Sequence, residues 1–419
     1  MNLLERRVYD LVKRNSDLKN SLVDLYQRLF YLWPVGQKHP GPGLIVREGF
    51  FFGFHDKCPW SVDQTRLLAH RARIENRMPR PHEPVDIGYF AAPDHTSFTS
   101  IAPSRAWNWQ QGSMLQWLGP SGCLVFNDCD GTKLVARVVD PAGQQTAVLP
   151  KPVAAVSADG RWALSYSFER MRHVAGAYAY ASGSDAEDDA PRSARDGLFL
   201  LDVAANKVQK LFTIADLVAA QPDETMSGAY HYLTHCLFNR SGSRFLFLHR
   251  WVRGGRTWTR LFSSDLGGDR RHIFPTNGMV SHFCWRDDRH VLAYASTAAM
   301  GDRYHLFEDE SERFVTIGDD FFRADGHPQF SPSGSWLLTD SYPDRSRLQS
   351  LFVYNVDEQR GATLARLKIP LQYRYDVRCD FHPRWSRDGR WICFDSAHTG
   401  RRALCTLEWT GLDDQAPRA

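Results

Sequence analysis

The stretch Asp325-Gly-His-Pro-Gln-Phe-Ser-Pro-Ser-Gly334 recurs in altered form along this chain of 419 residues. In four copies a histidine stands three residues before an aromatic residue, and each copy runs directly into a tight turn. Because equivalent positions of consecutive repeats come to equivalent positions in space, these histidines are expected to lie close together. The copies are His235-Cys-Leu-Phe238, His282-Phe-Cys-Trp285, His327-Pro-Gln-Phe330 and His382-Pro-Arg-Trp385.

The complete repeat consists of an aromatic or apolar residue, a turn and an apolar strand. Seven such units occur, with their strands at 66–69, 123–126, 162–164, 245–248, 291–294, 336–339 and 391–394. The histidines are 45 to 55 residues apart, which is close to the length of one four-stranded propeller blade. Each unit has two apolar faces that only stacking against neighbours can bury. The sequence therefore predicts an all-β fold, a seven-bladed β-propeller over residues 46–410.

The segments that flank the propeller have a different pattern. Residues 1–45 are predicted to form an N-terminal amphipathic α-helix and a linker, and residues 411–419 a C-terminal tail. The helical pattern covers residues 4–33 and ends at Pro34. This helix either packs against the propeller or contacts a membrane surface or a partner protein. Its apolar stripe consists of Leu18, Leu22, Leu25, Leu29 and Leu32.

One segment interrupts the repeats. Residues 174–197 contain few large apolar side chains after Tyr180, so they offer little burial to offset the entropy lost on ordering. We predict a mobile insertion after the third blade. It is either a lid over a site or a solvated loop without a role.

Composition narrows the possible functions. The 51 basic and 48 acidic residues are interspersed and leave a formal net charge of +3, so nucleic acid is not an expected partner. The eight cysteines form no C-x-x-C pair, which indicates reduced thiols. Neither a secretory signal nor an apolar run long enough for a transmembrane segment is present. These features predict a cytoplasmic protein.

Imidazoles and carboxylates share positions in the repeat. Asp325 and Asp380 stand five residues before the aromatic of their repeats, and His55 holds the same position before Trp60. In a closed ring the seventh blade adjoins the first, so these groups are expected to face one cavity. A divalent transition metal (Mn²⁺, Zn²⁺ or Fe²⁺) suits such donors, and the predicted ligands are His282, His327, Asp380 and His382.

Arginine and aromatic residues near the predicted site suit an acidic oligosaccharide or polysaccharide as partner. A guanidinium matches a uronate carboxylate, and aromatic faces stack on sugar rings. The preferred arginines are Arg170, Arg172 and Arg250. Predicted substrate-binding residues are His55, Tyr178, Trp109, Tyr342 and Arg378. Phosphate-binding loops and a nucleophile elbow are missing from the sequence, which disfavours phosphoryl transfer and serine hydrolysis.

These motifs resemble the oligogalacturonate lyase family of seven-bladed propeller polysaccharide lyases, and more loosely the TolB-like repeats. The resemblance begins at about residue 46 and is strongest around His235, His282 and His382. It implies that His235, in Thr234-His-Cys-Leu-Phe238, acts as the Brønsted base and that His282 binds manganese. The last-blade motif of the family has two metal-binding histidines and an upstream glutamine. Here His382 matches, Asp380 replaces the other histidine, and Val377 stands where the glutamine is expected.

The chemistry that the resemblance implies is β-elimination on a uronic-acid-containing glycan. A metal or an arginine neutralises the carboxylate while a base takes the C5 proton. Two alternatives stay open. One is a non-catalytic propeller that binds a glycan or serves as a scaffold in bacterial surface-polysaccharide biosynthesis. The other is a glycan hydrolase that uses Asp325, Asp380 or Asp56 as paired acid and base.

Overall fold

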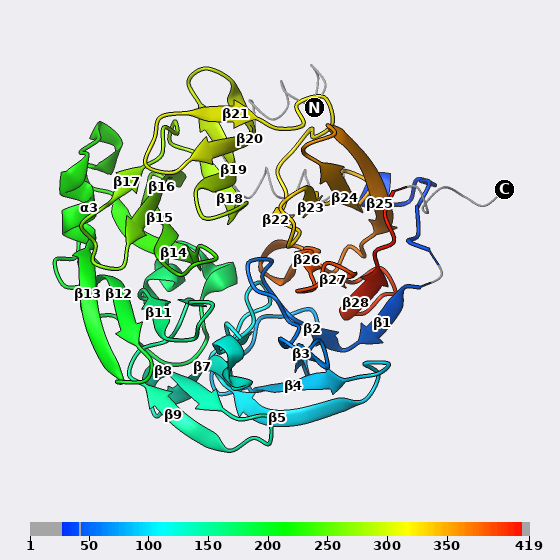
Figure 1. Ribbon diagram of the computed structural model, residues 1–419, viewed down its shortest axis with the longest axis horizontal. Helices are drawn as coiled ribbons and strands as arrows, with labels where there is room; N and C mark the ends of the chain where they lie inside the picture. Colours follow the sequence, from blue (N-terminus) through cyan, green and yellow to red (C-terminus); the bar gives the residue numbers. More distant parts are fainter. Residues whose placement is uncertain (1–26, 42, 413–419) are drawn as a thin grey trace.

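The computed structural model describes residues 27–41 and 43–412, and seven four-stranded antiparallel sheets form a ring around a central axis (Figure 1). The seven-bladed propeller predicted from the repeats is confirmed. The first three blades comprise β2 (Phe50–Phe51), β3 (Arg66–Arg71), β4 (Val85–Ala91) and β5 (Phe98–Ser104); β6 (Gln116–Trp117), β7 (Leu124–Asp130), β8 (Lys133–Val139) and β9 (Gln145–Leu149); and β10 (Ala155–Val156), β11 (Trp162–Ser165), β12 (Gly197–Asp202) and β13 (Lys207–Thr213).

The next three blades continue around the ring. They comprise β14 (Tyr230–Phe238), β15 (Arg244–Arg253), β16 (Arg256–Asp265) and β17 (His272–Ile273); β18 (Val280–Trp285), β19 (His290–Thr297), β20 (Gly301–Glu308) and β21 (Phe314–Thr316); and β22 (Gln329–Phe330), β23 (Trp336–Asp340), β24 (Leu348–Asn355) and β25 (Arg360–Lys368).

Blade 7 closes the ring with strands from both ends of the propeller. Its inner strands are β26 (Arg384–Trp385), β27 (Trp391–Ser396) and β28 (Ala403–Glu408), and its outer strand is β1 (Ile45–Glu48). Strand β1 pairs antiparallel with β28, with Val46 opposite Cys405. This pairing joins the two ends of the propeller in one sheet.

Neighbouring blades are also joined by a recurring polar contact. The strand next to the innermost one carries a polar side chain that accepts a backbone N–H from the following blade. Asn127 accepts from Val153 at 2.6 Å, and Asp340 accepts from His382 at 3.1 Å. Asp395 accepts from Phe52 and Gly53 in the same way, and His70 accepts from Ser113. These contacts satisfy backbone donors that would otherwise be buried without a partner.

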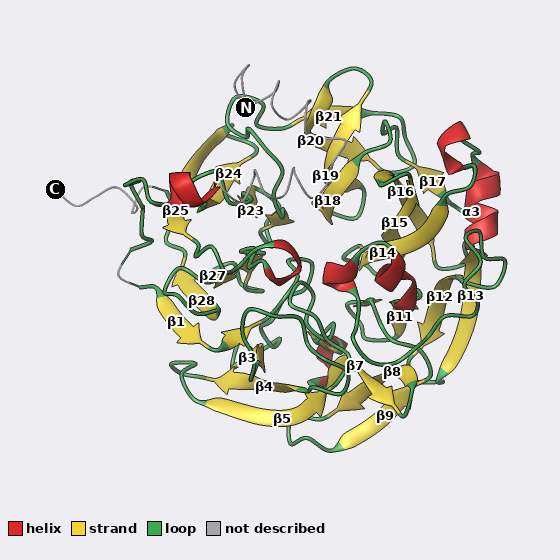
Figure 2. Ribbon diagram, turned by 180° about the vertical axis from the view of Figure 1, so that it is seen from behind, coloured by secondary structure: helices red, strands yellow, loops and turns green. Residues whose placement is uncertain are grey.

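Within the described propeller, helical turns lie in the connections between strands. Helix α3 (Ile214–Ala220) lies at the outer rim beside β13, whereas several short 3₁₀ turns lie closer to the axis (Figure 2). Thr213 and Asp216 form a capping box at the start of α3. The 3₁₀ turns are η1 (Gly119–Ser121), η2 (Glu169–His173), η3 (Gly176–Tyr178), η4 (Glu224–Met226) and η5 (Tyr375–Val377).

Residues 27–31 are helical, in agreement with the predicted N-terminal helix, whose first part at 4–26 lies outside the described residues. This segment contacts blade 6, because Lys368 Nζ donates to the carbonyl of Tyr31 at 2.5 Å and lies 4.3 Å from its ring. Leu32 and Trp33 are nevertheless 81% and 68% exposed. No helix in the described part of the chain is long and apolar enough to cross a membrane.

The insertion 174–197 lies across blades 2 and 3. Ser184 pairs with Lys133 in an isolated parallel bridge, and Asp185 accepts the backbone N–H groups of Phe168 and Glu169, each at 2.9 Å. The backbone carbonyl of Tyr178 also accepts from Asn108 Nδ2 at 2.9 Å. The insertion therefore has defined contacts on both sides, and its mobility stays a prediction.

Candidate functional site

The four repeat histidines meet at the axis of the ring. The ring centroids of His282 and His327 are 4.2 Å apart, as are those of His327 and His382, and His235 lies 6.4 Å from His282. Each of the four is at most 5% exposed. Phe54 stands among them, with its ring centroid 4.8 to 6.1 Å from every one of these imidazoles.

Irregular backbone turns these side chains toward the axis. His235 and His382 have φ values of +58° and +43°. These values lie in the left-handed region, which residues other than glycine rarely adopt. Met114, which occupies the same repeat position in blade 2, has φ +56°. The register of β14 shifts between Thr234 and Leu237, and that of β18 between Val280 and Phe283. Bulges of this kind redirect side chains near functional sites.

Asp340 fixes His327. Its carboxylate contacts Nδ1 of His327 at 2.8 Å and 3.0 Å and also accepts the backbone N–H of His327 at 2.8 Å. A carboxylate in this place holds the proton on Nδ1 and leaves Nε2 free as a ligand. Burial lowers the pKa of His327, but the charge and hydrogen bond of Asp340, together with the charges of Asp380 and Asp325, outweigh burial, so the pKa is raised overall.

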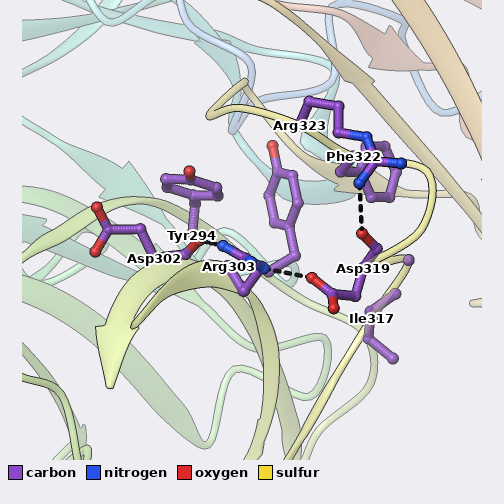
Figure 3. A pocket seen from close by; sticks show the side chains of 9 residues that line it. Tyr294, Asp302, Arg303, Ile317, Asp319, Phe322 and Arg323 are labelled. Carbon is purple, nitrogen blue, oxygen red and sulfur yellow. Dashed lines mark hydrogen bonds and ion pairs between the residues drawn. The ribbon is translucent and has the colours of Figure 1, made fainter. Parts of the chain in front are cut away.

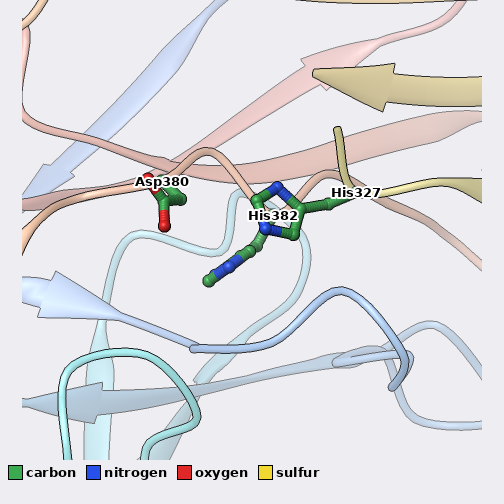
Figure 4. A group of neighbouring side chains, drawn as sticks. All are labelled: His327, Asp380 and His382. Atoms are coloured by element: carbon green, nitrogen blue, oxygen red, sulfur yellow. The ribbon is translucent and has the colours of Figure 1, made fainter. Parts of the chain in front are cut away.

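The most compact set of metal donors consists of His327, Asp380 and His382 (Figure 4). One ligand atom from each residue lies within 4.8 Å of the others. Nε2 of His327, Nε2 of His382 and Oδ1 of Asp380 are all buried and have no hydrogen-bond partner among the described residues. The other oxygen of Asp380 accepts from Arg378 Nε at 2.6 Å. Two imidazoles and one carboxylate oxygen fit a divalent transition metal.

His282, also predicted as a ligand, lies beside this set. Its Nδ1 contacts Ser281 Oγ at 3.0 Å and Asp325 Oδ1 at 3.3 Å. Burial, followed by the nearby charge of His327, lowers the pKa of His282. The structure therefore places His282 next to the three donors, with its ring held by Asp325.

His235 has the environment of a neutral base. Its Nδ1 contacts Thr234 Oγ1 at 2.7 Å, while its Nε2 is buried without a partner in the described chain. Burial and then the positive charge of Arg250 lower its pKa well below the ordinary value. Arg250 donates to the carbonyls of Val280 and Ser281, each at 3.4 Å, and its Nε has no partner among the described residues.

The predicted substrate-binding residues His55, Tyr178, Tyr342 and Arg378 surround this centre. The ring of His55 is 5.5 Å from that of His327, and its Nδ1 contacts the carbonyl of Pro328. Tyr178, from the insertion, lies 5.6 Å from His235, and its hydroxyl accepts from Arg378 at 3.2 Å. Tyr342 lies 5.4 Å from His327 and is 36% exposed, which places it at the mouth of the site.

The structure does not bring Arg170, Arg172 and Trp109 into this group. Arg170 donates to the carbonyls of His231 and Ala190 and is 2% exposed. Arg172 donates to the carbonyl of Tyr180 and, through Nη2, to that of Gly183. The indole N–H of Trp109 donates to the carbonyl of Arg77 at 2.7 Å. All three therefore have structural contacts away from the histidines.

Sequence reasoning missed Asp340 and Phe54. A signal for Asp340 exists, because Trp336-Leu-Leu-Thr-Asp340 and Trp391-Ile-Cys-Phe-Asp395 carry an aspartate at the same place in the repeat. Phe54 gives no such signal, because it belongs to an aromatic run that also contains Phe50, Phe51 and Phe52.

A pocket on blade 5 does not offer comparable chemistry. Figure 3 shows Asp319 facing Arg303, with which it forms an ion pair, while its backbone carbonyl accepts from Arg323 at 3.3 Å. The volume of this pocket is only about 100 Å³. None of its lining side chains has a buried polar atom without a partner in the described residues.

Comparison with known proteins supports the class of fold. An oligogalacturonate lyase in complex with manganese is 14% identical and covers 90% of this chain and 96% of its own, with a TM-score of 0.64. An oligogalacturonate lyase from Vibrio parahaemolyticus is 8% identical and covers 89% and 96%, with a TM-score of 0.61. The fold is therefore an oligogalacturonate-lyase-like propeller. No family model matches the chain, and a search of curated proteins by sequence gave no match.

Proposed function

We propose that the protein is a lyase that cleaves a uronic-acid-containing glycan by metal-assisted β-elimination. The observation that carries this proposal is the pairing of two features at the axis. Three buried donor atoms without partners in the described chain converge at His327, Asp380 and His382. Nε2 of His235, which has no hydrogen-bond partner in the described chain, lies in the same group of imidazoles.

The metal would be held by His327, Asp380 and His382, with His282 beside them. Manganese is proposed because one of the similar propellers is described in complex with that metal. When bound, such a cation neutralises a carboxylate and makes the neighbouring C–H more acidic.

The chain's own residues supply the proton transfers. His235, held neutral by burial, takes the C5 proton of the uronate on Nε2. The electron pair of that C–H bond forms the C4–C5 double bond as the C4–O bond breaks. The leaving oxygen takes up a proton, for which the hydroxyl of Tyr178 is well placed because Arg378 donates to its oxygen. Arg250 and Arg378 place positive charge beside the carboxylate of the uronate.

The cytoplasm is proposed as the working compartment. All eight cysteines are free and six of them are buried, which suits a reducing environment.

The test of the proposal is product formation from oligouronates. His235→Ala should abolish the release of unsaturated uronate products, which absorb near the ultraviolet edge, because no other group takes the C5 proton. His290→Ala is the matched control, since His290 is bound to Asp287 on blade 5, away from the axis. Equal rates for wild type and His235→Ala would refute the assignment of the base.

A second candidate is a non-catalytic propeller that binds a glycan. Val377, at the position of the family's glutamine, packs against the apolar cluster of Trp107 and Trp109 and offers no ligand. Metal analysis separates the two functions, because near-stoichiometric metal that is lost in His382→Ala supports the enzyme. A hydrolase is separated by its products, which contain no double bond. If the protein were a hydrolase, Asp56 would need a partner other than Lys57, whose Nζ lies 2.8 Å from its carboxylate.

A further inference from the structure

Blade 4 is taller than its neighbours at the end of the ring where the histidines lie. Strands β14, β15 and β16 contain 9, 10 and 10 residues. Residues 230–234 precede His235 in β14, and β15 and β16 continue beside them to a hairpin tip between Arg253 and Arg256. The tip therefore rises beyond the level of His235 on the same face of the propeller.

A groove of about 730 Å³ runs along this extension. Its walls are the hairpin tip, the connection that precedes blade 4 and the connection that leads into blade 5. Met279 lines the groove and stands three residues before His282 in the chain. None of the histidines of the centre lines the groove, and Met279 is the lining residue that stands nearest to them in the sequence. The groove is lined notably by Trp251, Trp258, Arg256, Arg260 and Asn277.

Arg260 is the unusual member of this lining. It is 7% exposed, and the acidic group that acts on it is the charge of Asp223, which opposes the effect of burial on its pKa without a direct ion pair between the two in the described residues. Its hydrogen bonds go to neutral groups, the carbonyl of Gln221 at 2.6 Å and the sulfur of Met226 at 3.2 Å, and its Nε has no partner in the described chain. Burial lowers the pKa of Arg260 to about 10. Buried charges are normally paired directly, and this guanidinium has no carboxylate within ion-pair distance among the described residues, which favours an anion as its partner.

Aromatic faces lie beside this charge. The guanidinium carbon of Arg260 is 5.1 Å from the ring centre of Trp251. Trp251 and Trp258 are nearly parallel, with an interplanar angle of 7°. The acid that lines the groove, Asp223, is occupied by Thr225, whose backbone N–H it accepts at 2.8 Å. The groove therefore combines a guanidinium that makes no direct ion pair in the described residues with apolar ring faces and an amide.

We propose that this groove binds a uronate residue of an acidic saccharide chain, at a subsite separate from the histidine centre. The fork of Arg260 would pair with the carboxylate, and the tryptophan faces would pack on sugar rings. That the same saccharide chain also reaches the histidine centre rests on the proposed function. The binding itself does not, because the groove residues take no part in the proton transfers.

The experiment measures binding by calorimetry in the His235→Ala background, so that no ligand is consumed. The probes are hexamers of galacturonate, of alginate and of hyaluronan, with methyl-esterified hexagalacturonate as the neutral counterpart and free acetate as a small carboxylate. Arg260→Met should weaken the best acidic hexamer by about tenfold or more, since a charge-assisted pair is lost. Arg253→Met is the matched control, because Arg253 lies on the same hairpin but donates to the carbonyls of Glu224 and Ser227.

The outcomes separate this inference from the proposed function. Equal affinity of Arg260→Met and Arg253→Met, or no binding of any acidic hexamer, would overturn the subsite. Binding of the esterified hexamer as tightly as the acid would also overturn it, as would equal affinity for acetate. Loss of binding in Arg260→Met, with no unsaturated product from the wild type, would support the subsite and refute the lyase. Thermal unfolding of each variant shows whether the fold is intact.

Discussion

At the scale of single residues, Asp340 connects two blades at the site. One buried carboxylate holds the imidazole of His327 and the backbone N–H of His382, so it aligns donors from blades 6 and 7. Asp340→Asn should therefore lower metal affinity by about 10- to 100-fold, the usual cost of losing a group that orients a ligand. Calorimetric titration of the purified variant with Mn²⁺ measures this loss.

The matched control for that variant is Asp395→Asn. Asp395 occupies the same repeat position in blade 7 and is equally buried, but it accepts from Phe52 and Gly53 and pairs with Arg384. The variant Asp395→Asn should lower the free energy of unfolding while leaving the Mn²⁺ affinity of the folded protein unchanged. A wild-type affinity in Asp340→Asn would show that His327 is not a ligand held by this carboxylate.

The repeat pattern predicts where the histidines lie better than it predicts what arginines do. Position in a repeat fixes the level of His235 or His327 along the axis, because the strands themselves carry that information. Arg170 lies in a 3₁₀ turn, and its long side chain reaches the carbonyl of Ala190. No periodicity records such a contact. Charge alone therefore does not distinguish a guanidinium that binds ligand from one that braces a loop.

At the scale of elements, the insertion 174–197 illustrates what composition leaves out. Its low apolar content predicts weak anchoring, yet polar groups provide contacts that apolar counting ignores. Asp185 accepts two backbone N–H groups of the turn at Phe168 and Glu169, and it holds the segment that carries Tyr178. Contacts of this kind depend on tertiary pairing, which a single sequence does not show.

Asp185 makes the stability of the protein depend on pH. Burial raises its pKa to about 6 from 3.8, so the folded state favours the protonated carboxyl. The resulting stabilisation is complete below pH 3.8 and is lost as the pH rises through about 6. Relative to Asp185→Asn, the wild type should lose about 2 kcal/mol of unfolding free energy between pH 4 and pH 7.

Urea unfolding of both proteins at several pH values checks this dependence. Asp188→Asn is the control, because the pKa of Asp188 is lowered despite the opposing effect of burial, by hydrogen bonds that include Ser193 and Arg195. The difference in unfolding free energy between the wild type and Asp188→Asn should change with pH in the opposite direction. A constant difference between wild type and Asp185→Asn across the range would contradict the raised pKa.

At the scale of the whole molecule, the number of blades could be predicted from the sequence, but the way the ring closes could not. Each repeat carries its own turn and apolar strand, so seven units can be counted directly. Strand β1 has no repeat of its own, and its pairing with β28 joins residues more than 350 positions apart. Local pattern contains no information about a partner so distant, and only the geometry of the closed ring selects it.

Arg47 on β1 links blade 7 to blade 1 and is the residue with which to test that closure. Its Nη1 donates to Thr406 at 3.0 Å, its Nε donates to the carbonyl of His95 at 2.6 Å, and its guanidinium carbon lies 5.0 Å from the ring centre of Phe90. Arg47→Ala should lower the free energy of unfolding by about 2 kcal/mol, because buried hydrogen bonds and a cation–π contact are lost together.

Arg66→Ala is the control for that variant, since Arg66 lies over Tyr89 within blade 1 and spans no junction between blades. It should cost no more than about 0.5 kcal/mol, the usual range for a surface substitution. Urea unfolding followed by tryptophan fluorescence measures both variants. Closure through β1 requires Arg47→Ala to be clearly the less stable of the two, and equal midpoints would show that the ring does not depend on this contact.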